Sequence, residues 1–174
     1  MIFVSVGTNE TRFDRMVEAV LTLPQGSDLF VQYGSSLITD GDGEWRDFLS
    51  FEEMEQAMRD ADVVICHAGA GSILLAQRCG HRPIVMARLG ELGEAVDDHQ
   101  LIMARRLDAY GVVTLVSDAD ELRAAVAAAS LPGAGAGDDA ETARLAADVR
   151  AALDGFAAPR RRRTLRRRTA RAGV

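Results

Sequence analysis

The sequence has no long hydrophobic run and only two cysteines. No apolar stretch in its 174 residues approaches the roughly 20 residues that a membrane-spanning helix needs, and the longest, such as Ile2 to Val6, have the length of a strand. The chain opens directly into this stretch, without the pattern of a secretory signal peptide. Cys66 and Cys79 form no CxxC pair and have no histidine at metal-ligand spacing. We therefore expect an intracellular, soluble protein with small buried thiols and no metal site.

Positive charge is scarce outside the last 15 residues. The chain carries 20 lysines and arginines against 26 acidic residues, a net charge of −6. Eight arginines crowd into residues 160–171, so the rest of the chain keeps twelve basic residues and has a net charge of −14. Such an acidic body argues against a nucleic-acid partner. The Arg-rich tail is open to two interpretations: a disordered extension, or a segment that contacts anionic lipid.

Short apolar runs alternate with segments of helical spacing along most of the chain. Strands are predicted at residues 1–6, 29–33, 46–49, 62–66, 83–87 and 112–116, and helices at 11–23, 52–60, 73–79, 97–110, 120–129 and 141–153. Uninterrupted apolar strands between helices are typical of a parallel sheet covered on both faces. We predict an α/β fold, a three-layer Rossmann-like domain with a mainly parallel sheet, over residues 1–155, followed by a tail over 156–174.

Ligands of open parallel sheets bind beyond the carboxyl ends of the strands, so the loops at those ends are candidate sites. Gly7 and Thr8 follow the first strand and precede a helix, where an anion binds well. An ordinary helix cap is the alternative for Thr8. Later, Asp98, His99 and Gln100 cluster at a predicted helix start, where their hydrogen-bonding groups suit sugar hydroxyls or a ribose, although acids there are also common caps.

The loop from His67 to Ser72 carries the stronger signal. It follows a five-residue apolar strand and opens a helix. Gly69 and Gly71 let the backbone approach a phosphate closely, and Ser72 adds a hydroxyl donor. A generic glycine-rich turn remains the alternative. The loop is not the dinucleotide-binding fingerprint, because the third glycine is missing.

Together, these loops resemble the C-terminal, donor-binding domain of glycosyltransferase family 28. The nearest likeness is to its stand-alone subunits: the catalytic subunit of the two-chain enzyme that adds the second GlcNAc to dolichol-diphosphate-GlcNAc, and bacterial exopolysaccharide glucosyl- and galactosyltransferase subunits. The resemblance spans roughly residues 1–130. Its matching pieces are Ile2–Thr8, Phe30–Ser35, Cys66–Ser72 and Asp97–Gln100.

The resemblance implies the C-terminal half of a GT-B fold, which holds a UDP-sugar against the strand ends with no metal or other cofactor. By position, it places Gly7, Thr8, Gly69, Gly71 and Ser72 at the diphosphate, His67 beside them, and Asp98, His99 and Gln100 at the donor sugar or ribose. In one departure, larger members of the family hold the ribose with a glutamate whose nearest equivalent here is Leu75.

The reaction that the resemblance implies is transfer of a hexose or N-acetylhexosamine from a UDP-sugar to a polyprenyl-diphosphate-linked acceptor, in cell-surface polysaccharide or glycan biosynthesis. The acceptor-binding half would be a separate, membrane-attached subunit that recruits the chain to the cytoplasmic face of the membrane. We assign the general base to no residue of this chain; His67 and His99 stay open as alternatives, although we favour positioning roles for both. Two alternatives stay open: another nucleotide-dependent enzyme on the same fold, and a non-catalytic subunit that binds the UDP-sugar without turning it over.

Overall fold

The computed structural model describes residues 1–130. They contain a six-stranded parallel sheet with the order β3-β2-β1-β4-β5-β6. Its strands are β1 (Ile2–Ser5), β2 (Leu29–Gln32), β3 (Glu44–Arg46), β4 (Val63–His67), β5 (Ile84–Met86) and β6 (Thr114–Val116). The predicted helix at 141–153, the predicted domain boundary at residue 155 and the Arg-rich tail lie outside the described residues.

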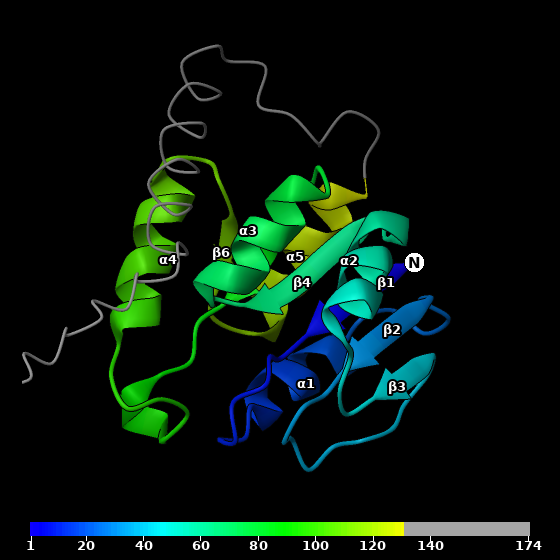
Figure 1. The fold of residues 1–174 in the computed structure, drawn as a ribbon, viewed down its shortest axis with the longest axis horizontal. Helices are drawn as coiled ribbons and strands as arrows, with labels where there is room; N and C mark the ends of the chain where they lie inside the picture. Colours follow the sequence, from blue (N-terminus) through cyan, green and yellow to red (C-terminus); the bar gives the residue numbers. More distant parts are fainter. Residues whose placement is uncertain (131–174) are drawn as a thin grey trace, which may run out of the picture.

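Helices cover both faces of this sheet. They are α1 (Asp14–Leu21), α2 (Phe51–Asp60), α3 (Ala70–Arg78), the short 3-10 helix η1 (Gly90–Leu92), α4 (His99–Ala109) and α5 (Ala119–Ala129). The helices α1 and α5 pack on one face, and α2, α3 and α4 lie on the other (Figure 1). The predicted three-layer α/β fold with a parallel sheet is therefore confirmed.

The central strands are buried on both sides. In β1, Phe3 packs with Met58 of α2 on one face, while Val4 packs with Met16 of α1 on the other, and both strand residues are fully buried. A strand in this position must be apolar at every residue, which explains the continuous hydrophobic runs in the sequence.

Two helix starts are fixed by their own sequence. The Ser50 side chain accepts a hydrogen bond from the Glu53 N–H at 3.2 Å, and the Glu53 carboxylate accepts one from the Ser50 N–H at 2.7 Å, which is a complete capping box for α2. Asp118 likewise caps α5 by accepting from the Glu121 N–H at 2.9 Å.

Long-range contacts move other elements away from their predicted bounds. The prediction of a third strand at residues 46–49 is wrong: Glu44–Arg46 pairs with β2, and Leu49 leaves the sheet to be buried in the core beside α2. The first helix starts three residues later than predicted, at Asp14, and the N–H of its N-cap residue Phe13 donates to the Ser36 hydroxyl at 3.4 Å. The third helix starts three residues earlier than predicted, at Ala70.

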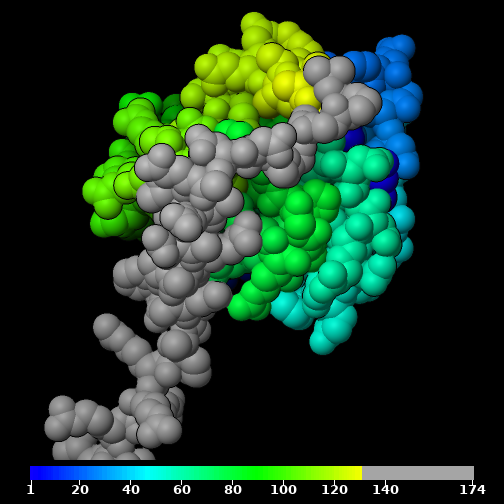
Figure 2. Space-filling view, turned by 90° about the horizontal axis from the view of Figure 1, so that it is seen from above, coloured from blue at the N-terminus to red at the C-terminus, as the bar shows by residue number. Residues whose placement is uncertain are grey.

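The strand order reverses direction at β1. The chain moves from β1 outward to β2 and β3, then returns to place β4 on the opposite side of β1. In the space-filling view, the blue and cyan part of the chain lies on the right of the molecule, and the yellow-green part that contains α4 lies on the left (Figure 2). Such a switch point leaves a crevice at the carboxyl ends of the two central strands, where ligands of this architecture bind.

No helix within residues 1–130 is long and apolar enough to span a bilayer.

Candidate functional site

A pocket of about 400 Å³ lies at the switch point, beyond the carboxyl ends of β1 and β4. It brings together residues from loops that are far apart in the sequence. Its lining residues are Gly7, Thr8, Asn9, Met54, His67, Gly71, Ser72, Arg88 and Gln100. Six of these were predicted as site residues from the sequence, and Asn9, Met54 and Arg88 were not.

Gly7 forms the turn that ends β1. Its φ of +84° lies in the left-handed region, which favours glycine. A Cβ atom at this position would also lie 2.6 Å from Cε1 of His67. Thr8 and Asn9, which follow the turn, are exposed at the mouth of the pocket. The turn therefore requires glycine for two independent reasons.

The turn between β4 and α3 supplies the second wall. His67 ends β4, and Gly69 is the N-cap residue of α3, where it offers no side-chain cap. A Cβ atom on Gly69 would collide with the imidazole of His67. Gly71 has open space where its Cβ would be and, with Ser72, belongs to the first turn of the helix.

The first turn of α3 is suited to an anion. The first N–H groups of any α-helix have no partner within it, and the helix dipole makes this end positive. The first turns of α2 and α5 carry acidic residues that compensate this charge, whereas α3 has none in its first turn. Backbone donors from Gly71 and Ser72 are therefore available to a negatively charged ligand in the pocket.

Unsatisfied polar atoms also concentrate at this pocket. Within residues 1–130, three buried side-chain nitrogen or oxygen atoms have no hydrogen-bond partner: Nδ1 of His67, Nε of Arg88 and Oε1 of Gln100. All three residues line the same pocket. Because buried polar groups in folded proteins are nearly always paired, three orphans around one cavity indicate a site that a polar ligand completes.

The electrostatic state of His67 follows from its surroundings. Burial lowers the pKa of His67 to about 4, and the positive charge of Arg88 adds to this effect. A hydrogen bond with the backbone of Ser5 raises the pKa, but by less. The imidazole is therefore neutral near pH 7, with one nitrogen that donates and one that accepts. It can form hydrogen bonds with a ligand but does not add positive charge.

The side chains of the predicted cluster at residues 98–100 have different surroundings in the structure. Gln100 lines the pocket. The Asp98 carboxylate instead accepts a hydrogen bond from the Gly90 N–H at 2.9 Å, which fixes the loop after β5. His99 is highly exposed, with Nδ1 2.8 Å from the Asp97 carboxylate. Of these three residues, the structure thus brings only Gln100 together with the glycine loops.

Leu75, which stands nearest to the ribose-binding glutamate of larger family members, is buried in the core between α2 and α3. Its side chain therefore contributes to packing.

Arg88 is a pocket residue that was not predicted from the sequence. It follows the apolar strand β5 by two residues and is only 1% exposed. A charged residue directly after a buried strand, on the side where ligands bind, is the sequence signal that could have identified it.

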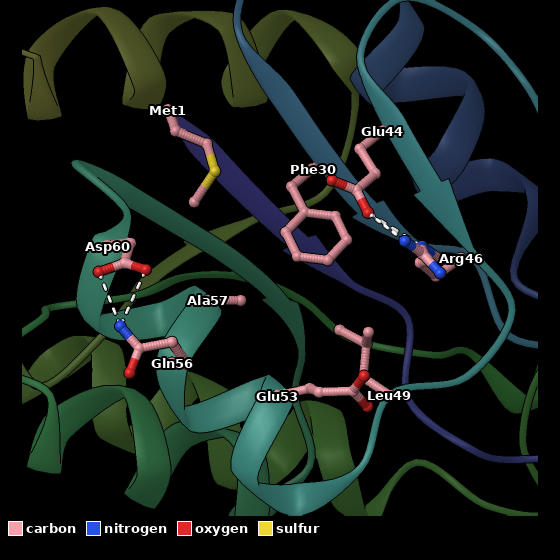
Figure 3. Close-up of a pocket in the computed structure, with 9 residues that line it drawn as sticks. All are labelled: Met1, Phe30, Glu44, Arg46, Leu49, Glu53, Gln56, Ala57 and Asp60. Atoms are coloured by element: carbon pink, nitrogen blue, oxygen red, sulfur yellow. Dashed lines mark hydrogen bonds and ion pairs between the residues drawn. The ribbon is translucent and has the colours of Figure 1, made fainter.

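A second pocket of about 290 Å³ lies between α2 and the sheet (Figure 3). Its wall is apolar at Met1, Phe30, Leu49 and Ala57. The polar side chains around it bind one another: Gln56 donates to Asp60 at 2.9 Å, and Arg46 lies 2.8 Å from Glu44. None of the three orphaned atoms named above belongs to it. The pocket at the switch point is therefore the better candidate for a polar ligand.

Residues 1–130 contain no group of three or more His, Cys, Asp or Glu that could hold a metal ion.

A solved structure described as the glycotransferase of kitacinnamycin superposes with a TM-score of 0.57 and 22% sequence identity, over 90% of this chain and 42% of the other. At that identity, the likeness shows a shared fold, and the chain spans less than half the length of that protein. No protein of curated function matches the sequence.

The profile of the glycosyltransferase family 28 C-terminal domain matches residues 1–149, which is most of the chain. With the parallel sheet, the switch-point pocket and the two glycine turns, this match settles the family: the chain belongs to glycosyltransferase family 28, as its C-terminal domain.

Proposed function

We propose that the switch-point pocket binds a UDP-sugar and that the chain is the donor-binding part of an enzyme that transfers a hexose or N-acetylhexosamine. The observation that carries the proposal is the convergence of three orphaned buried polar atoms on a pocket that also contains the acid-free first turn of α3. A diphosphate supplies the negative charge and the acceptor oxygens that this arrangement lacks.

The proposed chemistry is displacement at the anomeric carbon of the donor sugar. An acceptor oxygen forms the new bond as the bond to UDP breaks, and negative charge develops on the departing diphosphate. Backbone N–H groups of Gly71 and Ser72, the Ser72 hydroxyl and the Thr8 hydroxyl are the groups that would stabilise this charge without a metal or other cofactor. Gln100 would accept a hydrogen bond from a hydroxyl of the sugar or ribose through its unpaired Oε1.

The proton of the acceptor must leave by a different route. Among residues 1–130, no Asp or Glu lines the switch-point pocket. Burial lowers the pKa of His67 to about 4, which makes its imidazole a weak base, and the ring is packed beneath the Gly7 turn. We therefore place the general base on the acceptor-binding part of the enzyme, as a separate, membrane-attached subunit. That subunit would bring this chain to the cytoplasmic face of the membrane, where a polyprenyl-diphosphate-linked acceptor would receive the sugar.

Exposed apolar side chains support a partner at this end of the sheet. Six large apolar residues of the described chain, each more than half exposed, lie in the segments that follow the carboxyl ends of β2, β3 and β5. They are Leu37, Phe48, Phe51, Leu92, Val96 and Ile102. A second domain closing over the pocket would bury them, and apolar residues at the centre of an interface contribute much of its binding energy.

The test is calorimetric titration of the full chain with UDP, UDP-GlcNAc, UDP-glucose and UDP-galactose, with ATP and NAD as controls. We expect the UDP compounds to bind selectively, and the tightest of the sugars to identify the donor. Binding of UDP no tighter than that of ATP or NAD would contradict the proposal.

A non-catalytic UDP-sugar-binding subunit is the alternative, favoured because the part of the chain that the structure describes contributes no carboxylate to the pocket lining. Both functions predict UDP binding, so a transfer assay with the co-expressed membrane-attached subunit separates them. Turnover of UDP-sugar by the complex, lost when the pocket is mutated, identifies the enzyme. Turnover that persists after the same mutation identifies the binding subunit.

A further inference from the structure

Among residues 1–130, Arg88 is the only charged residue in the lining of the switch-point pocket, and it is buried rather than exposed to solvent. Its guanidinium lies 4.6 Å from the centre of the Phe13 ring, which covers one side of it. Burial lowers the pKa of Arg88, and the nearby Glu94 opposes this effect. Arginine nevertheless stays protonated in proteins, so a full positive charge is held behind the pocket wall.

The hydrogen bonds of Arg88 go to backbone carbonyls instead of to a carboxylate. Nη2 donates to the carbonyl of Val6 at 3.0 Å, and Nη1 donates to those of Thr11 at 2.8 Å and Arg12 at 3.0 Å. A third, longer bond from Nη1 reaches the Glu94 carbonyl at 3.3 Å. The Glu94 carboxylate is itself paired with Arg15, 2.8 Å away.

These contacts enclose one short segment of the chain. Val6 immediately precedes the Gly7 turn, and Thr11 and Arg12 follow Asn9, so one guanidinium holds both ends of the segment Gly7–Glu10. Gly7, Thr8 and Asn9 all line the pocket. The donors of a guanidinium are fixed and spread in one plane, which suits carbonyls on both sides of such a turn better than the compact ammonium group of lysine does.

We propose that Arg88 is a positioning residue that holds the Gly7–Thr8–Asn9 loop in place for the diphosphate of the donor. The inference rests on the proposed UDP-sugar site. The arginine also adds an incompletely neutralised positive charge close to that loop, in a poorly solvated environment where charge acts strongly on a bound anion.

The test compares Arg88→Lys with Arg15→Lys in the full chain, each titrated with UDP and with uridine. Arg15 is a matched control because its guanidinium also lies over the Phe13 ring, 5.3 Å from the ring centre, but binds Glu94, Ala87 and Ser117. We expect Arg88→Lys to weaken UDP binding by about tenfold or more and to leave uridine binding within about twofold, because only UDP carries the phosphates. Arg15→Lys should leave the ratio of the two affinities unchanged.

Equal weakening of UDP and uridine by Arg88→Lys, or UDP binding within about twofold of the wild type, would overturn the inference. If Arg88→Lys does not fold, Phe13→Leu replaces it, since this change removes the ring beneath the guanidinium but no donor or acceptor. The same selective loss of UDP affinity is expected there. A wild-type chain that fails to prefer UDP over ATP and NAD would instead refute the proposed function itself.

Discussion

The side-chain amide of Gln32 binds both backbone polar groups of Gly7: Oε1 accepts from the Gly7 N–H at 3.2 Å, and Nε2 donates to the Gly7 carbonyl at 3.1 Å. The same amide accepts from the Ser5 hydroxyl and donates to the Asp47 carbonyl. Gln32 is fully buried, so no water can replace these bonds. The conformation of the Gly7 turn therefore depends on a residue of the neighbouring strand.

Gln32→Leu should lower the free energy of unfolding by about 3 kcal/mol, because it leaves the backbone groups of Gly7 and the hydroxyl of Ser5 buried without partners. Urea denaturation measures the change. The control is Gln56→Leu, whose exposed amide bonds Asp60, and which should change stability by less than about 0.5 kcal/mol. Equal effects of the two substitutions would show that the Gln32 amide is not important for stability.

Gly71→Ala should separate stability from binding. Nothing lies within 4 Å of a Cβ at this position, so the methyl group meets no clash and reduces the freedom of the unfolded chain. We expect stability to rise by about 0.5 kcal/mol, and UDP affinity to fall because the methyl group occupies the pocket.

Gly71→Val should abolish UDP binding and leave the fold intact, as circular dichroism would verify. Ala124→Val, on an exposed position of α5, introduces the same β-branched residue away from the pocket and should keep full affinity. Unchanged UDP affinity in both Gly71 variants would move the diphosphate site elsewhere.

Stability should depend on pH through His67. Its pKa is about 4 in the folded chain, against an ordinary value of 6.5. Between those values the unfolded chain binds a proton that the folded chain does not, so this contribution is complete above about pH 6.5 and is lost as the pH falls towards about 4. The loss amounts to about 3 kcal/mol at most.

Urea denaturation at several pH values between about 7.5 and 4 measures this effect. His67→Gln should flatten the pH dependence, whereas His99→Gln, at an exposed position, should retain most of it. A wild type and a His67→Gln variant with the same pH dependence would refute the assignment.

The two thiols should react at very different rates. Burial raises the pKa of the Cys66 thiol to about 12, and this residue is fully buried. Cys79 is partly exposed, although burial raises its pKa as well. Because the thiolate is the reactive species, we expect a thiol reagent to modify Cys79 slowly in the native protein and Cys66 only after unfolding. Rapid native labelling of a Cys79→Ser variant would contradict this expectation.

Phe48→Asp tests the proposed interface. Phe48 is 64% exposed, so its replacement should change stability by less than about 0.5 kcal/mol. In the presence of the membrane-attached subunit, we expect co-purification and sugar transfer to fall by about tenfold or more. Tyr110→Asp, at the opposite end of α4 from Gln100, is the matched control and should leave both intact. A complex that forms equally well with either variant would place the partner on another surface.

Strands and glycine turns could be predicted from the sequence because their determinants are local. Continuous apolar runs indicate buried parallel strands, and Gly7 and Gly69 directly follow two of them. The two turns then meet because β1 and β4 are neighbours in the sheet. That adjacency belongs to the strand order β3-β2-β1-β4-β5-β6, which is common among doubly wound sheets.

Side-chain direction could not be predicted in the same way. Asp98 and Gln100 are two residues apart, yet the carboxylate binds the Gly90 N–H while the amide lines the pocket. Arg88 acts on carbonyls 76 to 82 positions earlier in the chain, through contacts that exist only after folding. The edge strand was misplaced for a related reason, because burial of Leu49 beside α2 decides where the sheet ends.

The imidazole of His67 fills the space that side chains at positions 7 and 69 would need. Acceptable substitutions at these three positions are therefore interdependent. A larger residue fits at position 69 only if the residue at position 67 is smaller than histidine. At position 7 the positive φ disfavours any other residue than glycine as well. Among divergent relatives, the three positions should change together or not at all, so a chain that keeps His67 but has lost either glycine must have rebuilt this end of its sheet.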